Sequence, residues 1–278
     1  MRLENESLGG VVRRSGAVAM PSRRRPLPVR FVMEFGLMGA LLALYLLLRF
    51  SMKGSIGDAV GNAHRVVQVE RAFGVFSESN LQSLALHSHD VILFLNAYYL
   101  LAHFTITGLF FAWMLIRHPD SYPGCRRILI VMTAIGLGIH AIYPLAPPRM
   151  LPDMGFIDTG RLFGPSPYGD TSKGLANQFA AMPSLHFGWA LLVAWGATRF
   201  STSKLRRVMW LHPLLTLAAI IITANHYWLD AAVALCIFLA ALNIDRALRR
   251  RFLRLRGTES LDDATARDPA TDSAIVAA

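Results

Sequence analysis

Six apolar runs, each close to the length of a membrane span, dominate the chain and leave little sequence for a water-soluble fold. A helix needs about 20 apolar residues to cross a bilayer. The composition agrees, since 54% of residues are hydrophobic and 17% charged, whereas soluble proteins carry about 25% charged residues. We therefore predict an all-α, polytopic membrane protein built as a six-helix bundle. The runs cover residues 31–50, 91–116, 127–145, 184–199, 208–224 and 228–247.

The composition also excludes several other classes of protein. It argues against disorder of the whole chain, a disulfide-rich secreted module and a fibrous protein. The two cysteines, Cys125 and Cys236, are too few and too far apart for a zinc site or a disulfide framework. Cys236 lies inside an apolar run, which favours a small buried hydrophobic side chain.

The polar segments divide the chain into three parts. Residues 1–30 are basic and rich in proline, and we expect a disordered cytoplasmic arm. Residues 253–278 are low in aromatic residues and predict a disordered cytoplasmic tail. The membrane domain is expected between them, over 31–252. Within it, residues 57–82 carry apolar positions at helical spacing, including Val60 and Val67, which predicts one or two amphipathic helices at the membrane interface before the second span.

The basic residues test the six-span topology. With six spans, the segments 1–30, 117–127, 199–207 and 246–278 share one side, and they hold 21 of the 28 lysines and arginines. Such an excess marks the cytoplasmic side. Both termini are therefore expected in the cytoplasm, with the loops 51–90 and 146–183 outside. The net charge of +10 is then explained by topology, and no nucleic-acid partner is expected.

Three short polar segments fall at the outer ends of the predicted spans. Residues 147–149 follow the third span, 182–186 open the fourth, and 225–230 connect the fifth with the sixth. Polar groups near membrane depth are costly to insert. All three segments fall on the same side of the topology, and the charge distribution fixes that topology independently. This convergence predicts one active site at the extracytoplasmic face.

The residue types in these segments suit phosphoryl transfer. His226 and Asp230 are four residues apart and would share a helical face, where the carboxylate can orient the imidazole as a nucleophile or base. His186 supplies a second imidazole that can protonate a leaving group. Arg149 and Ser184, the latter at a helix start, can bind phosphate oxygens. An acidic cluster for magnesium or calcium is lacking. We expect a membrane lipid as substrate and neither a metal nor another cofactor.

The same residues resemble a known family, the type-2 phosphatidic acid phosphatase superfamily. Ser184-Leu185-His186 and His226-xxx-Asp230 are similar to its second and third signatures. The chain further resembles the inositolphosphotransferase branch, which includes the aureobasidin-resistance type of inositol phosphorylceramide synthases and their actinobacterial relatives. The residues that carry this closer match are Ala146–Met150, Asn177–His186, Glu70, Arg71, Asn96, Tyr99 and His103.

The resemblance implies a six-helix enzyme with an outward-facing site. In the family, the histidine that matches His226 attacks phosphorus and forms a phosphohistidine. The residue that matches Asp230 orients this histidine, and the one that matches His186 protonates the departing alcohol. The expected activity is that of an integral-membrane phosphotransferase that moves a phosphoinositol-type head group to a lipid alcohol. Arg149 and Ser184 would bind phosphate, and Asn96, Tyr99 and His103 would line the acceptor or head-group pocket.

Two cations of the phosphatase signatures are missing from this chain. The lysine seven residues before the arginine corresponds to Ile142, and the Ser-Arg pair before the histidine corresponds to Ala219 and Ile220. The inositolphosphotransferase and sphingolipid-synthase branches also lack them. The loss therefore favours transfer over simple hydrolysis, and fewer cations suit a phosphodiester with one negative charge.

Structural and functional alternatives stay open on the sequence alone. His226 and Asp230 would also fit a structural ion pair, Ser184 a helix cap, and Arg149 an interfacial anchor. Asn96, Tyr99 and His103 lie at i, i+3 and i+7 and would also fit a hydrogen-bonded seam between spans. The alternative activity is a lipid phosphate phosphatase that hydrolyses phosphatidate or polyprenyl phosphate. In another class, the chain would be a non-catalytic lipid transporter or scramblase.

Overall fold

The computed structural model describes residues 26–51, 55–164 and 179–266, and the described part is helical throughout. It contains no β-strand, and only Leu145 and Ala180 form an isolated bridge. Its longer helices are α1 (Leu27–Ser51), α2 (Ile56–Ala72), α3 (Glu78–Ala85), α4 (His89–Ala97), the π-helix η1 (Tyr98–Ala102), α5 (His103–Arg117), α6 (Tyr122–Ile142), α8 (Leu185–Phe200), α9 (Leu211–Ile222) and α10 (Trp228–Ala266). Shorter pieces are α7 (Thr159–Phe163) and the 3₁₀ segments Pro148–Met150, Pro152–Met154 and Lys204–Trp210.

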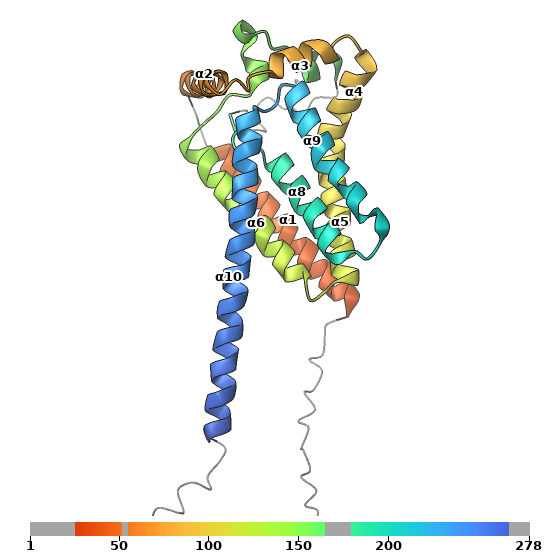
Figure 1. The fold of residues 1–278 in the computed structure, drawn as a ribbon, viewed down its shortest axis with the longest axis vertical. Helices are drawn as coiled ribbons and strands as arrows, with labels where there is room; N and C mark the ends of the chain where they lie inside the picture. Colours follow the sequence, from red (N-terminus) through yellow and green to blue (C-terminus); the bar gives the residue numbers. More distant parts are fainter. Residues whose placement is uncertain (1–25, 52–54, 165–178, 267–278) are drawn as a thin grey trace, which may run out of the picture.

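The long helices run up and down beside one another, and two short ones cross one end of the bundle. Helix α8 is central, since it contacts α5, α6, α9 and α10. Figure 1 shows α2 and α3 across the upper end, above the tops of α9 and α10. The first turn of α1 lies at the lower end of the bundle, and α10 extends downward past the same end (Figure 1). The upper end of the bundle is therefore covered by two short helices, α2 and α3, whereas α1 begins and α10 extends at the lower end.

Among the described residues, three helices are long and apolar enough to cross a membrane. They are His89–Arg117, which joins α4 to α5 through η1, Tyr122–Ile142, and the Trp228–Phe252 part of α10. The predicted all-helical membrane class is therefore confirmed. Helices α8 and α9, with 16 and 12 residues, are shorter than an ordinary span. The fifth predicted run, 208–224, is divided in the structure between a 3₁₀ segment and α9.

Helix α2 packs inward through small and apolar side chains, among them the predicted apolar residue Val67. Its buried residues are Ala59, Ala63, Val66, Val67 and Glu70, whereas Ile56 is 64% exposed. The two alanines allow the helix to approach the loop after α6 closely, so that the Ala146 amide donates to the Ala59 carbonyl at 3.1 Å. Small side chains decide the buried face here because they permit backbone contact, which a hydropathy pattern does not register.

Apolar side chains cover the outside of the bundle as well as its core. One buried cluster joins α5, α6, α8 and α10, and a second lies under α2 around Leu145, Leu151 and Tyr227. Many large apolar side chains are nevertheless exposed, among them Leu109 and Leu239. An apolar exterior of this extent is expected of a surface that faces lipid. Cys236 belongs to this exterior and is exposed, so the prediction of a buried cysteine was wrong.

Ion pairs join the helices toward the lower end. Glu34 of α1 pairs with Arg126 of α6, and Asp245 of α10 accepts from Arg127 of α6 at 2.6 Å and from Arg249 at 2.7 Å. Each carboxylate thus has a cationic partner, as buried or half-buried charges require. These pairs attach α1 and α10 to α6 at the end opposite α2 and α3.

Helix α10 is longer than the sequence indicates. It reaches Ala266 and so extends into residues 253–278, where the sequence predicts a disordered tail. The remainder of that tail, 267–278, and most of the predicted arm, 1–25, lie outside the described residues. Residues 27–30 of the arm form the first turn of α1.

Glycines bring α6 and α8 into close contact. A Cβ atom at Gly136 would lie 2.7 Å from Leu185 Cδ2 and 3.4 Å from Pro183 Cγ. Conversely, a Cβ atom at Gly188 of α8 would lie 2.8 Å from Met132 Cε. Close approach at small residues is a common way for membrane helices to pack. The contact at Gly136 bears directly on the polar segment 182–186.

We expect Gly136→Val to lower the thermal unfolding midpoint of the detergent-solubilised protein. Forcing two methyl groups into this contact must shift Leu185 or Pro183, and overpacking of this kind costs roughly 1–3 kcal/mol. The matched control is Gly138→Val on the same helix, where a Cβ atom meets nothing within 4 Å. Equal midpoints for the two variants would contradict the packing argument.

Candidate active site

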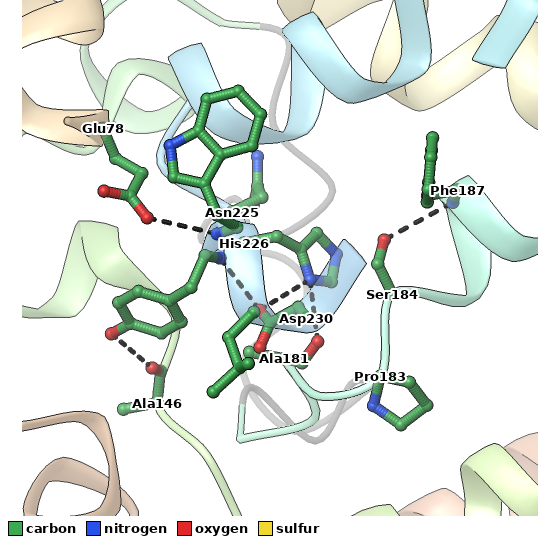
Figure 2. Close-up of polar contacts among 12 residues, drawn as sticks. Glu78, Ala146, Ala181, Pro183, Ser184, Phe187, Asn225, His226 and Asp230 are labelled. Carbon is green, nitrogen blue, oxygen red and sulfur yellow. Dashed lines mark hydrogen bonds and ion pairs between the residues drawn. The ribbon is translucent and has the colours of Figure 1, made fainter. Parts of the chain in front are cut away.

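The three predicted polar segments meet at the upper end of the bundle, where backbone hydrogen bonds join them. The Arg149 amide donates to the Ala224 carbonyl at 2.8 Å, and the Ser184 amide donates to the Asp230 carbonyl at 3.2 Å. The loop 179–184, the loop 146–151 and the connection between α9 and α10 are thus parts of one assembly. Figure 2 shows the centre of it, with His226 and Asp230 beside Ala181 and Ser184.

The end of α9 sets the position of His226. Ala224 adopts a left-handed conformation with φ 55°, and the amides of Asn225 and His226 both donate to the Ile220 carbonyl at 3.0 Å. Helices commonly end on one left-handed residue, which is usually glycine. An alanine at this position costs roughly 1 kcal/mol. This cost is offset by the packing of Ala224, which is fully buried, and by the hydrogen bond from the Arg149 amide to its carbonyl.

The hydrogen bonds of His226 define which ring nitrogen is free for chemistry. Its Nδ1 lies 2.7 Å from the Ala181 carbonyl oxygen and 3.2 Å from Asp230 Oδ2. A carbonyl oxygen only accepts, so Nδ1 must carry the proton. In the neutral ring, Nε2 on the opposite side then carries the lone pair. Only about 5% of His226 is exposed, so this orientation is firmly held.

Asp230 is fully buried and bonds to two neighbours of its own turn. Its Oδ2 accepts from the Tyr227 amide at 2.9 Å and faces His226 Nδ1. The carboxylate therefore caps the start of α10 and orients the imidazole at once. The predicted contact between His226 and Asp230 is present, but His226 lies in the turn before α10 and not on a helical face shared with Asp230.

His186 lies beside His226 and between aromatic rings. The two imidazole centroids are 6.2 Å apart. The Tyr99 ring stacks on His186 at 4.4 Å, and the His103 ring lies at 4.3 Å. His103 in turn stacks on Trp189 at 5.0 Å. These rings pack around His186, which is half-buried, and hold it next to His226.

The three residues predicted to line a pocket in the second span do not act alike. Tyr99 and His103 contact His186, as described above. Asn96 instead donates to the carbonyls of Thr159 and Gly164 at 3.2 and 3.0 Å, and its Oδ1 accepts from the Thr159 hydroxyl. The π-helical turn between Asn96 and His103 changes the helical phase, and such turns are often found at functional sites. Asn96 therefore anchors the outer loop at α7 rather than contacting the histidines.

Arg149 is buried against the residue that precedes His226. Its Nη1 donates to Asn225 Oδ1 at 2.7 Å, and its Nε lies 3.8 Å from Asp158 Oδ2. Asn225 is held in turn by its Nδ2, which donates to the Thr223 hydroxyl at 2.7 Å. The structure thus brings the guanidinium to the site, with Asn225 and Asp158 as partners that the sequence did not predict.

Ser184 caps the start of α8. The sequence allowed either this role or phosphate binding. The Ser184 Oγ accepts from the Phe187 amide at 3.4 Å, and the residue is fully buried. Its own amide bonds to the Asp230 carbonyl, which differs from the free amide that we expected at this position. A phosphate role for Ser184 would therefore depend on its hydroxyl proton and on later amides of the helix.

Two buried glutamates complete the start of α10. Glu78 Oε1 accepts from the Trp228 amide at 3.1 Å, and Glu70 Oε1 accepts from the Leu229 amide at 2.7 Å. Sequence analysis missed Glu78, and Glu70 was noted only for its resemblance to the family. Their separation from α10 by about 150 residues leaves no local pattern, and the one available signal is the presence of carboxylates in an otherwise weakly charged segment. Within the described residues, no group of three or more His, Cys, Asp or Glu side chains could hold a metal.

These features define a helical membrane protein with a buried His-His-Asp site and one arginine at one end of its bundle. A sequence profile of the PAP2 superfamily matches residues 64–244, which is more than half of the chain and includes every site residue named above. The chain therefore belongs to the PAP2 superfamily. Searches of curated proteins and of solved structures found no match. Family membership supports an enzyme of the lipid phosphatase or phosphotransferase type, located in a membrane.

We expect Tyr227→Phe to destabilise the site by roughly 1–2 kcal/mol, because an unsatisfied buried carbonyl costs about this much. The Tyr227 hydroxyl donates to the Ala146 carbonyl at 3.0 Å, and the side chain is fully buried. The control is Tyr143→Phe, since the Tyr143 hydroxyl has no hydrogen bond within the described residues. Thermal unfolding in detergent should give a lower midpoint for Tyr227→Phe alone, and equal midpoints would contradict the assignment.

Proposed function

We propose that the protein is a metal-independent phosphotransferase that moves a phosphoinositol-type head group between lipids through a phosphohistidine. The observation that carries the proposal is the orientation of His226. Its Nδ1 is engaged by the Ala181 carbonyl and Asp230, which leaves Nε2 as the nucleophilic atom. A structural ion pair alone would not require a second imidazole 6.2 Å away.

The reaction takes place in two displacements. His226 Nε2 attacks phosphorus, the N–P bond forms, and the bond from phosphorus to the lipid oxygen breaks while His186 gives its proton to that oxygen. An acceptor hydroxyl then loses its proton to His186 and attacks the phosphohistidine, so that the N–P bond breaks. Asp230 stabilises the charge that develops on His226. His186 thus returns to its starting protonation state after each cycle.

The charge on the phosphoryl oxygens is stabilised by Arg149, the Ser184 hydroxyl and the first turn of α8. Arg149 offers a planar group of donors beside Asn225, and phosphate oxygens suit this geometry. The amides at a helix N-terminus add partial positive charge. The mechanism requires no metal or other cofactor, because protein donors supply the electrostatic stabilisation.

The small number of cations favours a phosphodiester donor. Ile142, at the position of the missing lysine, is 82% exposed, and Ala219 and Ile220 are fully buried apolar residues. Arg149 is thus the cation that the signature positions retain. One arginine matches the single negative charge of a phosphodiester better than the two of a phosphomonoester. The phosphoinositol head group is proposed from the resemblance to the inositolphosphotransferase branch.

The proposed acceptor pocket lies beside His186, among buried polar side chains of α5 and α9. His103 Nδ1, Thr107 Oγ1 and His212 Nε2 are buried and have no hydrogen-bond partner within the described part of the chain. Buried polar atoms are costly when unsatisfied, so a hydroxyl-bearing ligand here would satisfy them. Because His103 also contacts the general acid and base His186, a hydroxyl bound at this position would lie close to the atom that removes its proton.

The topology that we propose has six spans, cytoplasmic termini and an extracytoplasmic site. The start of α1 and the far end of α10 share the lower end of the bundle (Figure 1), as an even number of spans requires. Basic residues such as Arg117, Arg127 and Arg207 lie in the connections that the sequence assigns to this side, in agreement with the positive-inside rule. Helices α2 and α3 would then lie at the outer interface.

We expect His226→Ala and His186→Ala each to abolish head-group transfer while the protein remains folded. Purified variants in detergent would receive labelled phosphatidylinositol with and without a lipid alcohol, and the labelled products would be separated. Wild type should place the label on the alcohol. The matched control is His87→Ala, since His87 is exposed and bonds only to carbonyls of its own turn.

The same assay separates the alternatives. Transfer that persists in His226→Ala would refute the nucleophile assignment. Release of inorganic phosphate from phosphatidate or polyprenyl phosphate without an acceptor would instead identify a lipid phosphate phosphatase. Lipid movement across vesicles that survives His226→Ala, with no product formed by wild type, would identify a transporter or scramblase.

We expect His103→Phe to impair the second displacement and spare the first. Phenylalanine keeps the aromatic contacts to His186 and Trp189 but removes the ring nitrogens that would bind the acceptor. Formation of phosphoenzyme from labelled donor should continue, whereas KM for the lipid alcohol should rise about tenfold, as loss of one hydrogen bond predicts. An unchanged KM would exclude His103 from the acceptor pocket.

A further inference from the structure

Three successive backbone amides at the start of α10 donate hydrogen bonds to carboxyl groups. Asp230 accepts from Tyr227 at 2.9 Å, Glu78 from Trp228 at 3.1 Å, and Glu70 from Leu229 at 2.7 Å. The first amides of a helix have no partner within the helix, and negative charge is favourable there. Asp230 belongs to α10 itself, but Glu70 comes from α2 and Glu78 from α3. The two helices that cross the top of the bundle are thus attached to the turn that carries His226.

The two glutamates are too closely packed to be ionised together. Glu70 and Glu78 are 1% and 0% exposed, and they accept from the adjacent amides of Leu229 and Trp228, which places their carboxyl groups side by side. Both oxygens of Glu78 are occupied, since Oε2 accepts from the Ser77 amide at 2.9 Å. Glu70 Oε2 is buried and accepts no hydrogen bond from the described residues. A proton on this oxygen would donate to Glu78 and satisfy both groups.

The charges around Glu70 favour its neutral form. The ionisable groups that face it are Glu78 of α3, Asp230 of α10 and the Tyr227 hydroxyl just before α10, and none of these is a cation. Burial, followed by the hydrogen bond to Glu78 and the charge of Glu78, raises the pKa of Glu70 to about 9. The Leu229 amide acts in the opposite direction but is the weaker influence. These surroundings favour a proton on Glu70 at neutral pH.

We propose that Glu70 and Glu78 form a carboxyl–carboxylate pair that shares one proton and positions His226 and Asp230 by holding the first turn of α10. This inference rests on the proposed function. The pair acts through backbone amides and touches no reacting atom, so both glutamates are positioning residues. The neutral carboxyl group matters because a third negative charge next to Asp230 would repel the carboxylate that orients His226.

The amide side chain of glutamine provides the decisive test. In Glu70→Gln, Oε1 can accept from the Leu229 amide and Nε2 can donate to Glu78, which reproduces the protonated glutamate. Glu70→Ala removes both contacts. We expect Glu70→Gln to keep kcat at neutral pH close to wild type. Glu70→Ala should lose about 100-fold in kcat with little change in KM, since small displacements of a reacting group cost this much.

The pH profile distinguishes a shared proton from a merely structural contact. Wild-type kcat should fall as pH rises through about 9, where Glu70 ionises, and Glu70→Gln should lack this loss. The matched control is Asp58→Asn on the same helix, because Asp58 is exposed and the variant should keep the wild-type profile. If Glu70→Gln were as inactive as Glu70→Ala at neutral pH, Glu70 would have to be ionised and the proposal would be overturned.

A stability measurement tests the pair without any activity assay. A carboxyl group whose pKa is raised on folding contributes stability that is present at low pH and is lost as pH rises from about 4.5 to about 9. The thermal midpoint of wild type should therefore fall relative to that of Glu70→Gln across this range. Parallel midpoints would refute the shared proton. The result stands even if His226→Ala proves active, so failure of the pair and failure of the proposed function can be told apart.

Discussion

The hydrogen bonds at the first turn of α10 are the interaction on which the site depends. Within a few residues, the chain ends α9, reverses direction and begins α10, and the amides of this turn are bonded to carboxyl groups from three helices. The Ala224 carbonyl in the same turn holds the Arg149 amide, and the Asp230 carbonyl holds the Ser184 amide. The segments that carry Arg149, Ser184 and His226 are therefore joined at this one turn.

The bundle explains why such a turn can persist in a membrane protein. A helix start has unsatisfied amides, and a reversal has unsatisfied carbonyls, both of which are costly away from water. The covering helices α2 and α3 supply the acceptors, and the loops at 146–151 and 179–184 supply the donors. The buried polar groups are thus satisfied by one another. This arrangement permits a deep, largely water-excluded site in which an imidazole keeps one orientation.

Sequence reasoning succeeded where the signal is local or cumulative. The apolar runs gave the helical membrane class, and His226 and Asp230 are in contact as expected, although across the turn before α10 rather than along a shared helical face. The convergence of Arg149, Ser184 and His226 followed from the order of the spans. Prediction from the sequence failed where contacts join distant segments. No pattern near Glu78 indicates its hydrogen bond with the Trp228 amide, 150 residues away. A hydropathy pattern also does not indicate how closely α2 approaches the loop after α6, because the small side chains of Ala59 and Ala63 allow that backbone contact.

The π-helical turn at Tyr98–Ala102 has a consequence for the way that members of such a family can diverge. A π turn holds one more residue per hydrogen-bonded ring than an α turn, and removal of one residue rotates all following side chains by about 100°. Deletion at this point would turn His103 away from His186 and leave Asn96 on the α7 loop. The length of this turn therefore sets which side chains of α5 face the histidines. A single insertion or deletion in this turn can thus change which side chains of α5 lie beside His186.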